Sequence, residues 1–206
     1  MGVLRRMAAP VHRRFRGRKS DYFLALLKAG EATTLLDVGG GTGMAGEFLP
    51  IYKTFHTVTV VNLDPPANAA LEVNHVRVVK GDGRCLPFSD KAFDWVFSNA
   101  VIEHVGDWSD QQKFSAEIRR VAARGYFVTT PNRYFPIEPH ALLPLYQFYP
   151  RWLKPIALRV SPGYMREVEN ISLLSKRKLK RLFPDADVTS FNFGSSLIAS
   201  CVCNGR

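Results

Sequence analysis

The stretch that decides the fold reads LLDVGGGTG, residues 35–43. An apolar run that stops at clustered glycines is typical of a strand entering a tight turn ahead of a helix. Because glycine carries no Cβ, the backbone of such a turn can approach a ligand closely, and the amides of the turn and of the next helix can face it. The stretch therefore predicts a ligand-binding turn at the end of a buried strand.

Outward from this turn, β-branched and apolar runs alternate with helical periodicity. Strands alternating with helices imply a parallel sheet covered on both faces. The last two strands are separated by little more than Gly194-Ser195, which is too short for a parallel crossover, so they should be antiparallel neighbours. We expect helices at 44–52, 110–123 and 172–183, and strands at 33–38, 57–64, 76–82, 93–100, 125–130, 186–194 and 196–204.

The length of 206 residues predicts one domain, 1–206, with two segments outside the α/β rhythm. One is a basic N-terminal segment, 1–30. The other is an insertion, 132–165, which is rich in proline and aromatic residues, follows the fifth strand, and lies where a substrate-side lid would be. The net charge of +10 is concentrated in two stretches: residues 1–20 hold seven Arg or Lys and no acid, and 176–181 add five more. These are local patches on a nearly neutral body, not a general nucleic-acid-binding field.

The cysteines and the N-terminal residues indicate the cellular compartment in which the protein is expected. Cys85, Cys201 and Cys203 supply neither paired bridges nor a four-ligand zinc pattern, and the last two should share one buried strand face. No apolar stretch approaches the roughly 18 residues of a membrane span. We therefore expect a cytoplasmic protein, with peripheral membrane contact and a mitochondrial transit peptide at the basic start as alternatives.

The motifs LLDVGGGTG, VVNLD, GDGRCLPF, FDWVFSNAVIEHV and GYFVTTPN follow one another over residues 33–131. In this order they resemble the class I S-adenosylmethionine (SAM)-dependent methyltransferases. The resemblance is strongest to the small-molecule branch (methyltransferase type 11), which includes the ubiquinone- and menaquinone-biosynthesis enzymes. It implies a Rossmann-like, doubly wound seven-stranded sheet, mostly parallel with an antiparallel last strand, and SAM as the cofactor.

The resemblance also implies a role for each strand end. Asp37 would hold the methionine ammonium, Asp64 the ribose diol, and Asp82 the adenine amine. A plain turn at Asp82-Gly83 and a helix cap at Asn99 are the structural alternatives. The implied cofactor-binding residues are Asp37, Gly39, Gly41, Gly43, Asp64, Asp82, Gly83 and Asn99.

Two places offer a general base for a hydroxyl acceptor. His104, preceded by Glu103, follows the fourth strand and should lie near the transferred methyl group; a packed histidine is the alternative. Some related enzymes pair such a Glu-His with an acid three residues before the Glu and bind a metal. That position is Ala100 here, so we expect no metal. The favoured base is His140, with Glu138 orienting it or binding substrate, because both lie in an extended, proline-held segment.

We expect methyl transfer, most simply to oxygen, on a small-molecule or amphiphilic acceptor. The aromatic and cationic residues of 141–160 suit either a lid over an apolar acceptor or a membrane-interface contact. A nucleic-acid methyltransferase is a rival because of the basic ends, but the Asn/Asp-Pro-Pro-aromatic turn of base-amine methylation is replaced by SNAV. A nicotinamide-dependent oxidoreductase and a non-catalytic SAM-binding partner subunit are the remaining alternatives.

Overall fold

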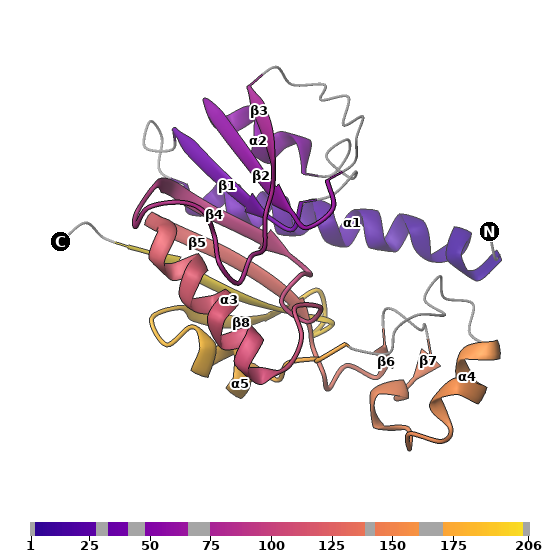
Figure 1. The fold of residues 1–206 in the computed structure, drawn as a ribbon. Coiled ribbons are helices and arrows are strands. Elements are labelled where there is room, and N and C mark those ends of the chain that lie inside the picture. Colours follow the sequence, from indigo (N-terminus) through magenta and orange to yellow (C-terminus); the bar gives the residue numbers. More distant parts are fainter. Residues whose placement is uncertain are drawn as a thin grey trace.

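The computed structural model describes residues 3–27, 33–40, 48–65, 75–138, 143–160 and 171–203, with the backbone alone at 3–12, 138 and 160. Helices and strands alternate along most of it (Figure 1). The elements are α1 (Val3–Leu26), β1 (Thr34–Val38), α2 (Leu49–Thr54), β2 (Thr57–Asn62), β3 (Val76–Lys80), β4 (Phe93–Asn99), α3 (Trp108–Val121), β5 (Ala122–Pro131), β6 (Ile137–Glu138), β7 (Leu143–Pro144), η2 (Tyr146–Phe148), α4 (Lys154–Val160), α5 (Lys176–Leu182), β8 (Asp187–Phe191) and β9 (Ser196–Val202).

Seven strands form one twisted sheet in the order β3-β2-β1-β4-β5-β9-β8. The pairs from β3 to β5 are all parallel, whereas β9 runs antiparallel to both β5 and β8. This confirms the predicted Rossmann-like sheet, including its antiparallel last strand. Because β1 to β5 run in one direction, their carboxyl ends meet at one edge, where such sheets bind ligands.

One face of the sheet is covered by α3 and α5 (Figure 1). Phe114, Ile118 and Val121 of α3 are fully buried against this face, as is Leu179 of α5. They occur at helical spacing, as the sequence indicated for α3. The burial of these apolar side chains holds both helices on the sheet.

The opposite face carries α1 and α2, and α1 is an element that we did not predict. The ring of Phe23 is fully buried and contacts the rings of Phe55, Trp95, Phe97 and Phe127. Pro10 and Gly17 lie within α1, and both residue types disfavour a helix interior. Packing of the apolar C-terminal turns therefore outweighs a weak local propensity, which is why sequence patterns missed this helix.

The predicted helices exist, but their boundaries were wrong. Helix α3 begins at Trp108, two residues early, because the Asp107 side chain caps it by accepting from the Asp110 amide at 3.1 Å. Helix α5 begins only at Lys176, after the cap residue Ser175. Helix α2 spans Leu49–Thr54 instead of 44–52, and residues 41–47 lie outside the described part of the chain.

The described residues 132–138 and 143–160 form a small lobe beyond the carboxyl end of β5, in which β6 and β7 make a two-stranded ribbon beside η2 and α4 (Figure 1). At the end of the chain, the sulfur atoms of Cys201 and Cys203 lie 3.7 Å apart on one strand face, as predicted, although both residues are only half-buried. Within the described ranges, no helix is long and apolar enough to cross a membrane.

Candidate cofactor and acceptor site

A cavity of about 730 Å³ opens at the carboxyl edge of β1 to β4. Small-molecule sites in proteins commonly have this size. The cavity lies where the sequence placed the ligand, at the turn after β1. Among the residues that line it are Val38, Gly39, Leu63, Asp82, Gly83, Ala100, Val101, His104, Phe114 and Ile171.

Two glycines in the cavity wall cannot be replaced without a collision. Gly39 has a φ of 83°, and a Cβ there would run into the Val101 side chain. A Cβ on Gly83 would lie 2.6 Å from Phe114 and 2.9 Å from Val38. Glycine at these positions therefore brings the backbone close to its neighbours and leaves the cavity open. Gly41 and Gly43, the other predicted loop glycines, lie outside the described residues.

Asp37 lies beneath the glycine turn. Its carboxylate is buried and accepts a hydrogen bond from the Tyr52 hydroxyl of α2. A Cβ on Gly40 would lie 2.7 Å from this carboxylate, so the turn passes directly over it. Burial raises the pKa of Asp37 to about 7, although the bond from Tyr52 opposes the shift. A nearby ligand ammonium would favour the ionised form, which fits the predicted role.

Asp64 lies exposed just beyond β2, next to the wall residues Asn62 and Leu63. Its backbone N–H donates to the Asn62 side-chain oxygen at 3.0 Å. The Asn62 amide in turn donates to the Gly40 carbonyl at 2.7 Å. These two hydrogen bonds link the loop after β2 to the turn after β1. Neither involves the Asp64 carboxylate, so its contact with the ribose stays a prediction.

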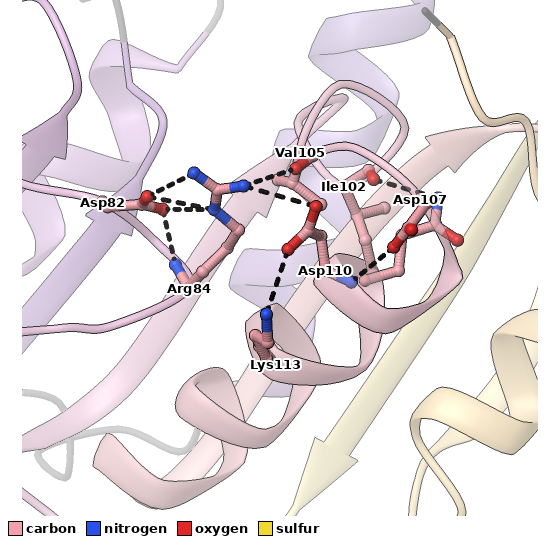
Figure 2. A network of polar contacts seen from close by, with 8 residues as sticks. Asp82, Arg84, Ile102, Val105, Asp107, Asp110 and Lys113 are labelled. Atoms are coloured by element: carbon pink, nitrogen blue, oxygen red, sulfur yellow. Dashed lines mark hydrogen bonds and ion pairs between the residues drawn. The ribbon is translucent and has the colours of Figure 1, made fainter.

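Asp82 is engaged by a residue that the sequence analysis did not single out (Figure 2). The Arg84 guanidinium binds both Asp82 oxygens, at 2.7 to 3.1 Å, and also reaches the Asp110 carboxylate at 3.4 Å and the Val105 carbonyl at 3.3 Å. The hydrogen bonds from Arg84 hold the pKa of Asp82 below its usual value. Arg84 thus joins the loop after β3 to the first turn of α3 and keeps Asp82 ionised at the predicted adenine subsite.

Asn99, at the end of β4, belongs to a buried polar cluster with α1. Its side-chain oxygen accepts from the Thr129 hydroxyl at 2.7 Å and from the Lys19 ammonium at 3.3 Å. Burial lowers the pKa of Lys19 to about 8, an effect that the Glu103 charge partly offsets. The predicted cofactor contact of Asn99 stays a prediction, and the adjoining cavity wall is formed by Ala100, which has a φ of 56°. Lys19 was missed because its partners are distant in sequence.

The Glu103-His104 pair divides between the core and the cavity. Glu103 is fully buried and accepts from the Thr130 hydroxyl at 2.9 Å. The His104 side chain is 40% exposed and lines the cavity, with its Nε2 4.0 Å from the Glu103 carboxylate. Of the predicted bases, His104 therefore lies at the cavity, with the Glu103 carboxylate near its ring. His140 and the Glu138 side chain lie outside the described residues, so their roles stay predictions.

Comparison with known proteins agrees with this geometry. Residues 36–129 match the family model described as a methyltransferase domain. The chain is 32% identical, over 100 residues, to malonyl-[acyl-carrier protein] O-methyltransferase of Herminiimonas arsenicoxydans; the match covers 48% of this chain and 37% of that enzyme. The chain thus spans well under half the length of this curated relative.

Solved structures share the fold at low identity. Magnesium protoporphyrin IX methyltransferase from Synechocystis PCC 6803, solved with bound SAH, has a TM-score of 0.65 at 14% identity, covering 98% of this chain and 88% of that one. A putative methyltransferase of Haloferax volcanii, solved with the Trm112 activator, has a TM-score of 0.63 at 16% identity, covering 98% of both chains. The match over residues 36–129, the sheet order and the cavity at its carboxyl edge agree in making this chain similar to class I SAM-dependent methyltransferases.

Proposed function

We propose that this chain transfers a methyl group from SAM to an oxygen atom of a small or amphiphilic acceptor by in-line displacement. The observation that carries the proposal is the cavity after β1 and β4, whose lining includes both His104 and Gly39 of the glycine turn. Positioning of the acceptor in such a site supplies much of the rate enhancement. The oxygen acceptor draws support from the curated relative, which is named for O-methylation of a malonyl-acyl carrier protein.

The residues present fit the cofactor. The glycine turn leaves backbone room for it, and the cavity volume suits a molecule of its size. When bound, SAM supplies a methyl group already activated on a sulfonium. Asp37 would hold its ammonium group, Asp64 its ribose diol, and Asp82 with Gly83 its adenine. Arg84 keeps the Asp82 carboxylate ionised and in place.

His104 would take the proton of a hydroxyl acceptor. Its ring lines the cavity, and the buried Glu103 carboxylate behind it would favour the protonated imidazolium that results. The Thr130 hydroxyl bond fixes the Glu103 side chain. A general base of this kind contributes about 10² to 10⁴-fold to the rate. The pair Glu138 and His140, in the lobe after β5, is the alternative source of the base.

The acceptor would approach from the side of the lobe. The insertion 132–165 follows β5 directly at the carboxyl edge, and it combines apolar and cationic side chains. We propose that it acts as a substrate-side lid suited to an acceptor with an apolar body and an anionic or polar head. Residues Ile171 and Ser172, just beyond this insertion, already form part of the cavity wall.

A methyl-transfer assay with radiolabelled SAM tests the proposal. Acceptors would include acyl-thioester carboxylates and prenylated phenols, each beside a short polar analogue. We expect turnover with an amphiphilic acceptor and binding of SAM and of its demethylated product by calorimetry. The absence of both heat and turnover would reject the assignment, whereas heat without turnover on any acceptor would favour a non-catalytic SAM-binding subunit.

Variants identify the base. With a hydroxyl acceptor, His104→Ala should lower kcat by about 10² to 10⁴-fold and leave the affinity for the demethylated product nearly unchanged. His56→Ala is the matched control, because His56 is exposed and precedes β2 at the opposite edge of the sheet. His140→Ala, assayed in parallel, tests the alternative. Full turnover by His104→Ala with a strong loss in His140→Ala would transfer the role to His140.

A further inference from the structure

Exposed apolar side chains are concentrated in the lobe after β5. Nine large hydrophobic residues are exposed in the described part of the chain, and six of them lie between residues 134 and 156. Trp152 is 71% exposed and Tyr134 64%. Soluble surfaces seldom gather so many large apolar groups in one short segment without a partner. We call this set the lobe surface; it comprises Tyr134, Ile137, Leu145, Phe148, Trp152 and Ile156.

The lobe surface is separate from the side chains that hold the lobe together. Tyr146 and Ala157 are buried and pack with Leu143, Tyr149 and Leu158 in a small core of their own. The Gln147 side-chain amide donates to the carbonyls of Arg133 and Phe135, both at 2.9 Å, and fixes the start of the lobe. The exposed set lies outside this small core, and its exposure calls for another explanation.

Aromatic and cationic residues are interleaved along the segment that carries this surface. The Tyr134 and Phe148 rings stack with centroids 6.3 Å apart, both exposed to solvent. Four cations lie in residues 133–160, namely Arg133, Arg151, Lys154 and Arg159, against a single acid, Glu138. Aromatic side chains beside Lys and Arg are typical of segments that lie in the interface of an anionic bilayer.

Helix α1 extends this cationic surface. A chain of contacts connects it to the lobe: Arg18 lies over the Phe193 ring at 5.9 Å, and the neighbouring Gly194 carbonyl accepts from the Asn132 side chain at the base of the lobe. Phe193 itself is 87% exposed. In Figure 1 the N-terminal half of α1 and the lobe project beyond the sheet at the same end. Four exposed arginines lie on the part of α1 whose side chains are described, namely Arg13, Arg14, Arg16 and Arg18, whereas Lys19 is buried.

We propose that the lobe surface, Phe193 and the four exposed arginines of α1 together bind the surface of an anionic lipid bilayer. Charge complementarity selects this occupant: a neutral apolar partner would gain nothing from the cations, whereas anionic headgroups pair with them while the aromatic rings enter the interface. This binding requires neither cofactor nor methyl acceptor, so it stands apart from the proposed methyl transfer. It would bring the carboxyl edge of the sheet toward the layer in which an amphiphilic acceptor dissolves.

Vesicle sedimentation tests the proposal with the full chain. We expect binding to phosphatidylcholine vesicles that contain phosphatidylserine, weak binding to phosphatidylcholine alone, and a steep loss of binding with added salt. Removal of one interfacial cation weakens such binding about fivefold, so Arg151→Gln with Arg159→Gln should weaken it roughly 25-fold. The matched control is Lys53→Gln with Arg77→Gln, which removes the same charge at the β3 side of the sheet, where both residues are exposed.

Fluorescence gives an independent readout. The chain has three tryptophans: Trp95 is buried, Trp108 is half-buried, and Trp152 is the exposed one. Anionic vesicles should therefore shift the emission to the blue through Trp152, and Trp152→Phe should abolish the shift while sedimentation is largely retained. Because the ring is exposed, this substitution leaves the core intact.

Three outcomes would overturn the proposal. One is the absence of sedimentation with phosphatidylserine vesicles at low salt. Another is equal weakening by the Lys53/Arg77 control, which would reduce the effect to net charge. The last is concentration-dependent self-association that Trp152→Ala abolishes without any lipid binding, which would make the lobe surface an interface between copies of the chain. None of these results depends on whether the chain transfers methyl groups.

Discussion

Two carboxylates at the same edge of the sheet, Asp37 at the end of β1 and Asp82 just after β3, have opposite surroundings. Asp37 is buried under the glycine turn with the neutral Tyr52 hydroxyl as its partner, and its pKa is raised to about 7. Asp82 is half-buried and bound by the Arg84 guanidinium, and its pKa is lowered. Sequence position alone assigns both to cofactor binding, but the neighbouring side chain decides the charge that each carries.

The difference has a functional consequence. Because its pKa is lowered below the usual value, Asp82 keeps its negative charge over the neutral range in which Asp37 titrates. Asp37 changes its charge near neutral pH, so a ligand ammonium that needs the ionised form would bind with release of a proton. The predictions below test this difference, from the largest expected effect to the smallest.

The largest effect concerns stability without ligand. Asp37 has a pKa of about 7 in the folded chain against a model value of 3.8. Between these values the unfolded chain has lost the proton and the folded chain keeps it, so the free energy of unfolding falls as pH rises, by up to about 4 kcal/mol. Urea unfolding at about pH 5 and about pH 7 should show about half of this fall, roughly 2 kcal/mol.

Asp37→Asn is the control for this slope. It keeps the shape of the side chain and an acceptor for the Tyr52 hydroxyl but cannot ionise. Carboxylates with lowered pKa values, such as Asp82 and Asp94, stabilise the folded state as pH rises from the acid range, and their contribution is common to both proteins. The difference between wild type and variant therefore isolates Asp37. If the free energy of unfolding changed with pH equally in wild type and in Asp37→Asn, Asp37 would be ionised over this whole range.

A buried cation sharpens the comparison. Lys19 has a pKa of about 8 in the folded chain, lowered by burial from 10.5. Between these values the unfolded chain keeps the proton that the folded chain has lost, so the free energy of unfolding should rise with pH, by up to about 3 kcal/mol. Lys19→Met should remove the rise in alkaline unfolding curves. If the variant keeps the same rise, Lys19 is not its source.

Ligand affinity should separate Asp37 from surface acids. Asp37→Asn removes a charged hydrogen bond to the ammonium of the bound ligand, which is expected to cost about 2 kcal/mol, or roughly thirtyfold in Kd for the demethylated product. Wild-type affinity should increase as pH rises toward the pKa of Asp37, and the variant should lack this dependence. Calorimetry measures both. Asp90→Asn, on a side chain that is 77% exposed, is the control and should bind as wild type does.

The smallest effect is expected at Arg84, the partner of Asp82. Arg84→Gln removes the hydrogen bonds that lower the pKa of Asp82, so that pKa should move up toward its ordinary value in a carboxyl NMR titration. Stability should fall only slightly, because the guanidinium is partly exposed and screened by solvent. Lys113→Gln, which also contacts Asp110, should leave the pKa of Asp82 closer to that of wild type. An unchanged Asp82 titration in Arg84→Gln would contradict the assignment.

Local patterns predicted the sheet, and a cavity opens at the turn where they predict the cofactor. Apolar runs identified the strands, and the short link before Ser196 required the antiparallel hairpin. Helix α1 escaped prediction because Pro10 and Gly17 weaken its local signal, although Phe23, Leu26 and Leu27 recur at helical spacing near its end. The boundaries of α3 and α5 depended on the cap residues Asp107 and Ser175, which pattern alone did not identify.

The partners of the site residues were not predictable in this way. Tyr52 reaches Asp37 across 15 residues, and Lys19 reaches Thr129 across 110. A single sequence carries no local signal for such pairs, since they depend on how helices are laid on the sheet. The pairing of Arg84 with Asp82 could have been predicted from the sequence, because the two residues are only two positions apart in the motif GDGR.

The amino-acid sequence by itself determined the seven strands of the main sheet, the glycine turn after β1, and the acids at the strand ends. These features follow from hydrophobic periodicity and backbone sterics, which act over a few neighbouring residues. Only the tertiary structure decided which of these acids are buried, which side chain binds each one, and that Glu103 enters the core while His104 lines the cavity. Burial and the charge of a partner set protonation, and both arise when segments distant in the chain pack together.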